Sequence, residues 1–308
     1  MAGRLQGKVC IVTGSGSAIG RASALMFARE GARVVGADIA PGAGQAVLDE
    51  VRAAGGNMVS LHPCKLTNPN RCNDLVKFAL DHYGRLDVLF NNGARTQFAW
   101  IADLTLDRLQ STIAEELSIV FALCTAAWSA LATYHGVIIN TASTADGTTF
   151  RALGGIAHCA AKSGVIAMTR QLALEGRHHG IRANSISPGT IGTPAMKAHM
   201  SNAEWAKAML DKIMLGRLGE PEEIAAVALF LASDESSFVN GTDIIADGGA
   251  ATSRATQFTW LPGLAQEFAG RGSGEGVYSR RGRDAPEPAS GAAQRQRLDR
   301  SQFVIPQP

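Results

Sequence analysis

Residues 13–20 read TGSGSAIG and are the part of the sequence most indicative of the fold. A short apolar run, 8–12, precedes this stretch, and an amphipathic run, 19–30, follows from its end. Small residues let a backbone approach a phosphate closely, and the unpaired N–H groups at the start of a helix attract an anion. The order of strand, glycine-rich turn and helix therefore predicts a pyrophosphate-binding turn around Gly14 and Gly20.

A carboxylate follows the next apolar run. Asp38 ends the segment RVVGAD at 33–38, and 38 − 20 places it 18 residues beyond Gly20. In a dinucleotide-binding fold an acid at this place binds the ribose hydroxyls. A carboxylate there repels a 2′-phosphate, and neither Ser17 nor Ile39 supplies a positive charge to attract one. The pattern therefore favours NAD over NADP as the cofactor.

Short β-branched runs alternate with longer amphipathic stretches from Gly7 to about Ala251. This alternation is typical of a parallel sheet covered by helices, which is the α/β class. We expect strands at 8–12, 33–37, 57–63, 88–91, 136–141, 182–187 and 243–246. We expect helices at 19–30, 43–54, 72–83, 106–133, 157–179 and 221–232. Residues 1–254 are interpreted as one such domain.

The composition changes in the carboxyl-terminal extension, 255–308. From about 270 onward it is rich in Gly, Pro, Ser, Arg and Gln, with too little apolar surface to offset the entropy of ordering. We therefore expect disorder from about 270. Seven Arg against four acidic residues make this part basic. A solvated end is the simpler interpretation, and binding of nucleic acid or an acidic partner is the alternative.

The composition of the whole chain limits the classes of function. Lys+Arg 29 against Asp+Glu 27 gives a net charge of +2, which argues against partners such as nucleic acid or an acidic membrane. No apolar run reaches the roughly 18 residues that span a bilayer, and no signal peptide opens the chain. Five scattered cysteines fit a reducing compartment. We expect a cytoplasmic protein, and the histidines lack metal-ligand spacing.

Further motifs follow in order along the chain. They are NNGA at 91–94, NTAS at 140–143, AKSG at 161–164, IRANSISPG at 181–189, Thr193 and DGG at 247–249. With these motifs, residues 5–252 resemble the short-chain dehydrogenase/reductase family. The resemblance implies a doubly wound, seven-stranded Rossmann fold and a nicotinamide cofactor. It also implies interconversion of a small-molecule alcohol and a ketone, in a homotetramer or homodimer.

The resemblance also implies which residues bind the cofactor. They are Gly14, Ser17, Ile19, Gly20, Asp38, Leu66, Asn91, Lys162, Pro188, Gly189 and Thr193. Asn91 is expected along the adenosine side. Pro188, Gly189 and Thr193 are expected beside the nicotinamide, and Lys162 is expected at the hydroxyls of the nicotinamide ribose.

Two of the family's four catalytic residues match this chain. Ser143 matches the serine after the fifth strand, and Lys162 matches the lysine of the motif Y-x-x-x-K. His158 stands where the tyrosine belongs, and Glu116 stands where the family has an asparagine. The implied catalytic set is thus Ser143, His158, Lys162 and Glu116. A slip of one residue in this match would put Glu115 in place of Glu116.

An imidazole can in principle replace the phenol as the proton carrier, because it titrates at roughly 6.5 when unperturbed. His158 and Lys162 are four residues apart and should share a helix face, where an ammonium favours the neutral ring. A neutral ring suits a base, and hence alcohol oxidation. However, an imidazole nitrogen lies roughly 2 Å closer to its own backbone than a phenol oxygen, and proton transfer needs close approach. Glu116 could act on either Lys162 or His158.

Three functions therefore stay open. The leading hypothesis is an NAD-dependent oxidoreductase that interconverts an alcohol and a ketone with an altered acid/base centre. The second is a redox-impaired, nucleotide-binding homologue that serves as a sensor or partner subunit. The third is a non-redox dehydratase or isomerase that uses His158 and Ser143. The tyrosines Tyr83, Tyr134 and Tyr278 offer no obvious replacement for the missing phenol.

Overall fold

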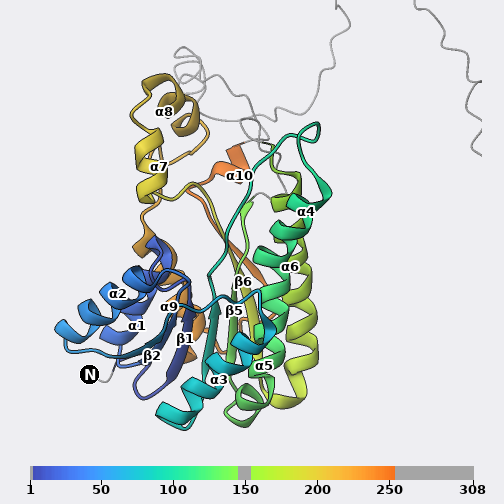
Figure 1. The fold of residues 1–308 in the computed structure, drawn as a ribbon. Coiled ribbons are helices and arrows are strands. Elements are labelled where there is room, and N and C mark those ends of the chain that lie inside the picture. Colours follow the sequence, from blue (N-terminus) through green and yellow to red (C-terminus); the bar gives the residue numbers. More distant parts are fainter. Residues whose placement is uncertain (1–2, 145–153, 254–308) are drawn as a thin grey trace, which may run out of the picture. The chain divides into compact units, whose positions relative to one another are not determined.

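The computed structural model describes residues 3–144 and 154–253, and its centre is a parallel sheet (Figure 1). The strands are β1 Val9–Thr13, β2 Arg33–Ala37, β3 Asn57–Leu61, β4 Val88–Asn91, β5 Val137–Thr141, β6 Arg182–Pro188 and β7 Asp243–Ala246. Their order is β3-β2-β1-β4-β5-β6-β7, and every neighbouring pair is parallel. The predicted doubly wound Rossmann sheet is confirmed. Its strand order reverses between β1 and β4, where such sheets bind ligands at the carboxyl ends of the strands.

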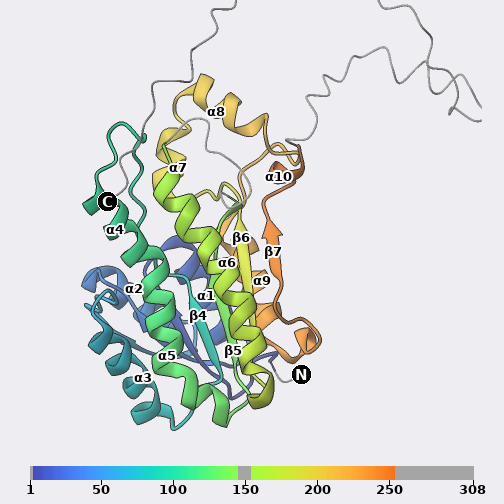
Figure 2. The same cartoon turned by 90° about the vertical axis from the view of Figure 1, so that its right-hand side faces the viewer.

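Helices cover both faces of the sheet (Figures 1 and 2). One face carries α1 Ala18–Arg29, α2 Pro41–Ala53 and α9 Pro221–Ala232. The other carries α3 Pro69–Tyr83, α5 Ile119–Thr133 and α6 Ile156–Gly176. Because both faces are covered, all five residues of β1 are buried, as expected of a central parallel strand.

Local sequence signals explain where several elements begin and end. Pro41 and Pro69 each open a helix two or three residues earlier than the apolar pattern predicts, because a first helical residue needs no N–H partner. Gly84 ends α3 in the left-handed conformation, with φ of 72°. The strand predicted at 57–63 is shorter than expected and ends at Leu61, since Pro63 has no N–H group to pair.

The helix predicted at 106–133 is continuous but not uniform. It consists of α4 Leu106–Ile113, a π-helical turn Ala114–Ser118, and α5. By length and composition alone this stretch meets the criterion for a membrane span, contrary to our expectation that no run does so. This is weak evidence, because a core helix of an α/β domain passes the same test, and α5 packs against α3, β4 and β5.

Short helices lie beyond the carboxyl ends of the strands. They are α7 Pro194–His199, α8 Ala203–Leu210 and α10 Ala250–Ser253, and α4 lies at the same end (Figures 1 and 2). Two 3-10 turns, Arg177–His179 and Asp234–Ser236, follow α6 and α9. The predicted extension 255–308, with Tyr278, lies outside the described residues.

Candidate active site

The glycine-rich turn between β1 and α1 is held by very close backbone approaches. A Cβ atom on Gly20 would lie 2.0 Å from the carbonyl oxygen of Gly14, and Gly14 itself has φ of +63°. Ser17 caps α1: its hydroxyl donates to the Gly14 carbonyl at 2.7 Å and accepts from the Gly20 N–H at 3.4 Å. Only glycine fits at positions 14 and 20, so the backbone of the turn stays open to a ligand.

Asp38 lies directly beside this turn. One carboxylate oxygen accepts from the backbone N–H of Gly16 at 2.8 Å, and the other accepts from Ala40 at 2.8 Å. The side chain of Asp38 is nearly buried. The predicted pyrophosphate turn and the predicted ribose acceptor are therefore adjacent in space.

Three buried oxygens near the carboxyl ends of the strands have no hydrogen-bond partner among the described residues. They are Ser15 Oγ, after β1, Asn91 Oδ1, at the end of β4, and Thr141 Oγ1, at the end of β5. The amide nitrogen of Asn91 does have a partner, Asn140 Oδ1, at 2.8 Å. Buried polar atoms are normally paired. Together with the glycine turn, these oxygens fit a polar ligand such as a dinucleotide.

Helix α6 brings His158 and Lys162 to the same end of the sheet. Both side chains are buried, as their spacing of four residues on one helix face leads us to expect. The ammonium of Lys162 donates to the backbone carbonyl of Thr141 at 2.8 Å. Burial lowers the pKa of Lys162, and the negative charge of Glu116 offsets part of that shift.

The π-helical turn presents Glu116 to His158. The Glu116 side chain is 0% exposed, and its two oxygens lie 2.7 and 3.0 Å from Nδ1 of His158. Glu116, and not Glu115, occupies this place, and the Oε2 atom of Glu115 is buried without a partner among the described residues. Of the two partners left open for Glu116, the hydrogen bond goes to His158. Single π-helical turns are frequent at functional sites.

The loop after β4 supplies two residues that our sequence analysis missed. Thr96 forms a hydrogen bond with Oε1 of Glu116, and the ring of Phe98 stands edge-on to His158, with 5.7 Å between ring centroids. No motif marks either residue, so no sequence signal except proximity to Asn91 could have found them. Pairing of Ala99 with Gly154, 2.8 Å from N–H to carbonyl, ties this loop to the start of α6.

The other predicted cofactor residues occupy the same end of the sheet. Pro188 ends β6, and the N–H of Gly189 donates to Ala246 at 3.0 Å. Thr193 caps α7, accepting from the Met196 N–H at 3.2 Å. Ile19 and Leu66 pack partly buried against the two apolar cores. Ser143 follows β5, next to the segment 145–153 that lies outside the described residues.

Neither described tyrosine approaches this site. The Tyr83 hydroxyl donates to Asn57 at 2.7 Å, and the Tyr134 hydroxyl donates to the carbonyl of Gly84 at 3.1 Å. Asn57 begins β3 and Gly84 follows α3, so both contacts lie toward the opposite, amino-terminal end of the strands. Within the described ranges no group of three or more His, Cys, Asp or Glu residues could hold a metal ion.

Comparison with known proteins identifies the family. The family model described as enoyl-(acyl carrier protein) reductase matches residues 14–251. A putative short-chain dehydrogenase/reductase from Burkholderia xenovorans has the same fold, with a TM-score of 0.77, 34% identity, and coverage of 82% of this chain and 99% of that one. The chain belongs to the short-chain dehydrogenase/reductase family.

Two further members are similar to this short-chain dehydrogenase/reductase. Cyclohexanol dehydrogenase from Acinetobacter sp. is 37% identical over 251 residues, which are 80% of this chain and 96% of that protein. A 7α-hydroxysteroid dehydrogenase, solved with NADH and 7-oxo glycochenodeoxycholic acid, has a TM-score of 0.76 and 30% identity, covering 80% of this chain and 95% of that one. These relatives are oxidoreductases, which supports an oxidoreductase here.

Proposed function

We propose that this protein is an NAD-dependent oxidoreductase that interconverts a small-molecule alcohol and a ketone. The observation that carries the proposal is the burial of His158 and Lys162 on one face of α6, at the same end of the sheet as the glycine turn. Buried titratable groups beside a ligand-binding turn are typical of a catalytic centre. The substrates in the names of cyclohexanol dehydrogenase and 7α-hydroxysteroid dehydrogenase, both ring alcohols, are the first to test.

The preference for NAD rests on Asp38. Its carboxylate is held at the glycine turn by the N–H of Gly16. A 2′-phosphate placed there would meet a negative charge, and burial of an unpaired charge is costly. Gly14, Ser17, Ile19, Gly20, Leu66, Asn91, Pro188, Gly189 and Thr193 complete the proposed cofactor site.

The proposed chemistry divides among four side chains. Ser143 hydrogen-bonds the substrate oxygen, Lys162 binds ribose hydroxyls, and His158 exchanges the hydroxyl proton. In the oxidative direction, the alcohol C–H bond breaks with its electron pair leaving as hydride, while the O–H proton passes to the imidazole. A bound oxidised nicotinamide supplies the hydride acceptor. Glu116 belongs to the site because it contacts His158.

The assembly and the location are inferred separately from the reaction. We infer a homotetramer or homodimer from the family resemblance, and a cytoplasmic location from the composition. Neither a nucleic acid nor a membrane partner is needed for the proposed reaction.

A redox-impaired, nucleotide-binding role is the second candidate. It is favoured by the shorter reach of an imidazole, roughly 2 Å less than that of a phenol, at the position the family gives to tyrosine. A substrate seated for tyrosine would then be too far for direct proton transfer. Non-redox use of His158 and Ser143, as in a dehydratase or isomerase, is the third candidate.

Calorimetry and steady-state kinetics test the proposal together. We expect NAD to bind more tightly than NADP, and alcohols such as cyclohexanol to reduce bound NAD. His158→Gln keeps a donor for Glu116 but cannot carry a proton, so kcat/KM should fall about 10²- to 10⁴-fold while NAD affinity is kept. Binding of NAD without turnover, combined with activity that appears only in His158→Tyr, would support the redox-impaired role instead.

A further inference from the structure

We propose that Thr96 and Glu116 are positioning residues that fix the tautomer of His158, so that Nε2 is the ring nitrogen that exchanges the proton of the reaction. The role of Nε2 in proton exchange rests on the proposed oxidoreductase function. The tautomer of His158 is a property of the protein alone and can be measured without a substrate. It assigns the proton chemistry to a chain, Thr96–Glu116–His158, in which neither of the first two residues needs to touch the substrate.

The contact between Glu116 and His158 sets the tautomer. An ionised carboxylate only accepts hydrogen bonds, so a ring nitrogen 2.7 Å from it must carry a proton. That nitrogen is Nδ1, which leaves Nε2 to gain or lose the second proton. A carboxylate buried against Nδ1 also stabilises the imidazolium that forms when Nε2 takes up a proton, as in catalytic triads.

Thr96 holds the carboxylate in place. Its hydroxyl bonds Oε1, while Oε2 makes the shorter contact with Nδ1. The position of Thr96 is itself fixed, because each of the next three residues of its loop is hydrogen-bonded to α4 or to the segment just before α6. Gln97 Nε2 donates to Ser111 Oγ at 3.2 Å, the carbonyl of Phe98 accepts from Arg108 at 3.2 Å, and Ala99 pairs with Gly154.

The hydrogen bonds in the site separate Glu116 from Lys162. The side chain of Glu116 is fully buried, and its negative charge raises the pKa of Lys162 against the larger, opposite effect of burial. Lys162 donates its hydrogen bond to the carbonyl of Thr141 and not to Glu116. The carboxylate is therefore left to bind Thr96 and His158, and the lysine and imidazole have separate hydrogen-bond partners.

Nitrogen NMR of the full-length protein labelled with ¹⁵N-histidine tests the tautomer without any substrate. Loss of one signal pair in His158→Gln assigns the ring. We expect the Nδ1–H form in the wild-type protein. In Glu116→Gln the hydroxyl of Thr96 keeps the amide oxygen, so the NH₂ group faces Nδ1 and the ring should change to the Nε2–H form.

A double variant isolates the contribution of Thr96. In Thr96→Val with Glu116→Gln no hydroxyl holds the amide oxygen, so the amide can rotate and a population of the Nδ1–H form should appear beside the Nε2–H form. Thr112→Val is the matched control in the same Glu116→Gln background. Thr112 is also buried and lies one turn before Glu116. Its hydroxyl donates to the Arg108 carbonyl in its own helix at 3.0 Å, with no other side-chain hydrogen bond among the described residues. This control should leave the Nε2–H form unchanged.

Kinetics provides the second readout. Glu116→Gln should lower kcat by about 10²- to 10⁴-fold and move the acid limb of the pH profile to lower pH, because the imidazolium loses its partner. Thr96→Val should lower kcat about 10-fold, as for residues that orient a catalytic group, and Thr96→Ser should restore it. Thr112→Val should leave the pH profile unchanged.

The outcomes separate the two proposals. An Nε2–H ring in the wild-type protein, or an Nδ1–H ring in Glu116→Gln, overturns the positioning chain whatever the activity. A double variant with no detectable Nδ1–H population overturns the role of Thr96. The expected tautomers in a protein that binds NAD but transfers no hydride would uphold the chain while rejecting the proposed oxidoreductase function.

Discussion

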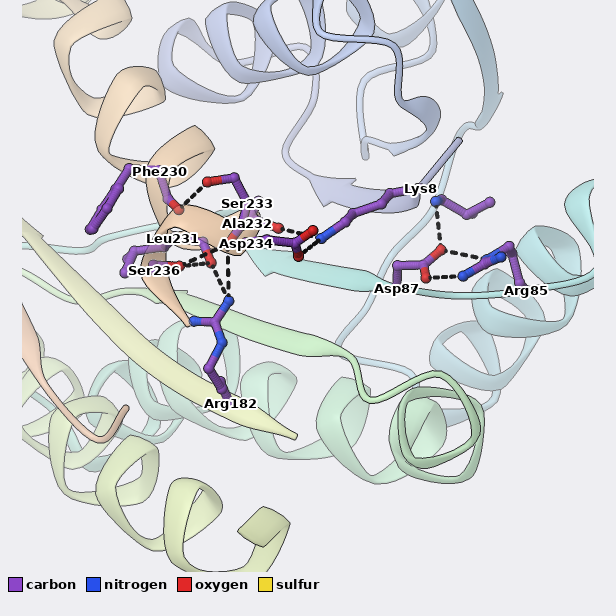
Figure 3. Close-up of polar contacts among 11 residues, drawn as sticks. Lys8, Arg85, Asp87, Arg182, Phe230, Leu231, Ala232, Ser233, Asp234 and Ser236 are labelled. Atoms are coloured by element: carbon purple, nitrogen blue, oxygen red, sulfur yellow. Dashed lines mark hydrogen bonds and ion pairs between the residues drawn. The ribbon is translucent and has the colours of Figure 1, made fainter. Parts of the chain in front are cut away.

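The two ends of the parallel sheet differ in how completely their polar groups are paired. At the amino-terminal end, Asp87 accepts from the Val9 N–H at 2.8 Å and from two nitrogens of Arg85 at 2.6 and 2.9 Å (Figure 3). Arg182 donates to three backbone carbonyls, two of them Leu231 and Ser233 around the end of α9 (Figure 3). The charged side chains at this end therefore stabilise the fold by bonding to the backbone and to one another.

The carboxyl-terminal end is different. Ser15, Asn91 and Thr141 each keep a buried oxygen without a partner among the described residues, and Lys162 is a buried cation. A folded chain normally pairs such groups because each unpaired one costs about 1–3 kcal/mol. Unpaired polar groups therefore lower the stability of this protein at one end of its sheet, and active sites are where such a cost is expected.

A cavity by itself does not identify the functional end. The amino-terminal end has an opening of about 460 Å³, lined by charged residues that include Lys8, Asp87, Arg182 and Asp234. Its cations are already engaged: Lys8 pairs with Asp234, Arg85 with Asp87, and Arg182 with carbonyls. An entering anion would have to replace these contacts. Pairing of polar groups is therefore the better guide to function here.

The largest effect on folding is expected from Asp87→Ala at the paired end. The change leaves the buried N–H of Val9 without an acceptor and Arg85 without its ion pair. We expect the free energy of unfolding to fall by about 2–4 kcal/mol, measured by urea denaturation. NAD affinity measured by calorimetry should not change. Asp234→Ala is the control: its side chain is 89% exposed, so the loss should stay below about 1 kcal/mol.

An intermediate effect of opposite sign is expected from Lys162→Met. Burial lowers the pKa of Lys162, so below that lowered pKa the folded protein carries the cost of a buried ammonium. The variant should be more stable at pH 7 while its activity is lost, because the net lowering of the pKa means that burial outweighs the attraction of Glu116.

The pH dependence of that difference gives the sign test. Between the lowered pKa of folded Lys162 and its unfolded value near 10.5, the unfolded chain binds more protons, so wild-type stability rises with pH. The methionine variant lacks this rise. The stability difference between the two proteins should therefore shrink as the pH approaches 10.5. A variant that is less stable at pH 7 would show that the Thr141 and Glu116 interactions outweigh burial.

The features that sequence predicted well are local. The strands are apolar runs bounded by turns, so the sequence shows where they lie. The glycine turn needs a backbone conformation or a close approach that only glycine allows at positions 14 and 20, so its sequence is also recognisable. The shared helix face of His158 and Lys162 follows from their spacing of four. Each of these depends on neighbours in the chain.

The features that sequence could not predict depend on distant contacts. The π-helical turn interrupts a helix that the sequence predicts as one uninterrupted stretch, and it carries Glu116, the residue that the family resemblance implied. Thr96 is 20 residues from Glu116, in a loop with no motif. The short helices α7 and α8, which sequence reasoning did not predict, are too brief for periodicity to reveal.

The smallest effect is expected at one of the two threonines that end strands β1 and β5. Thr141 has a buried hydroxyl without a described partner, so Thr141→Val should raise the free energy of unfolding by up to about 1 kcal/mol in urea denaturation. Thr13 is the matched control, because its hydroxyl oxygen accepts from the N–H groups of Asn92 at 3.0 Å and Gly93 at 2.9 Å. Thr13→Val should instead lower that free energy by about 1–3 kcal/mol. Equal losses in both variants would mean that the Thr141 hydroxyl is paired in solution, and the contrast between the two ends of the sheet would then lose one of its main supports.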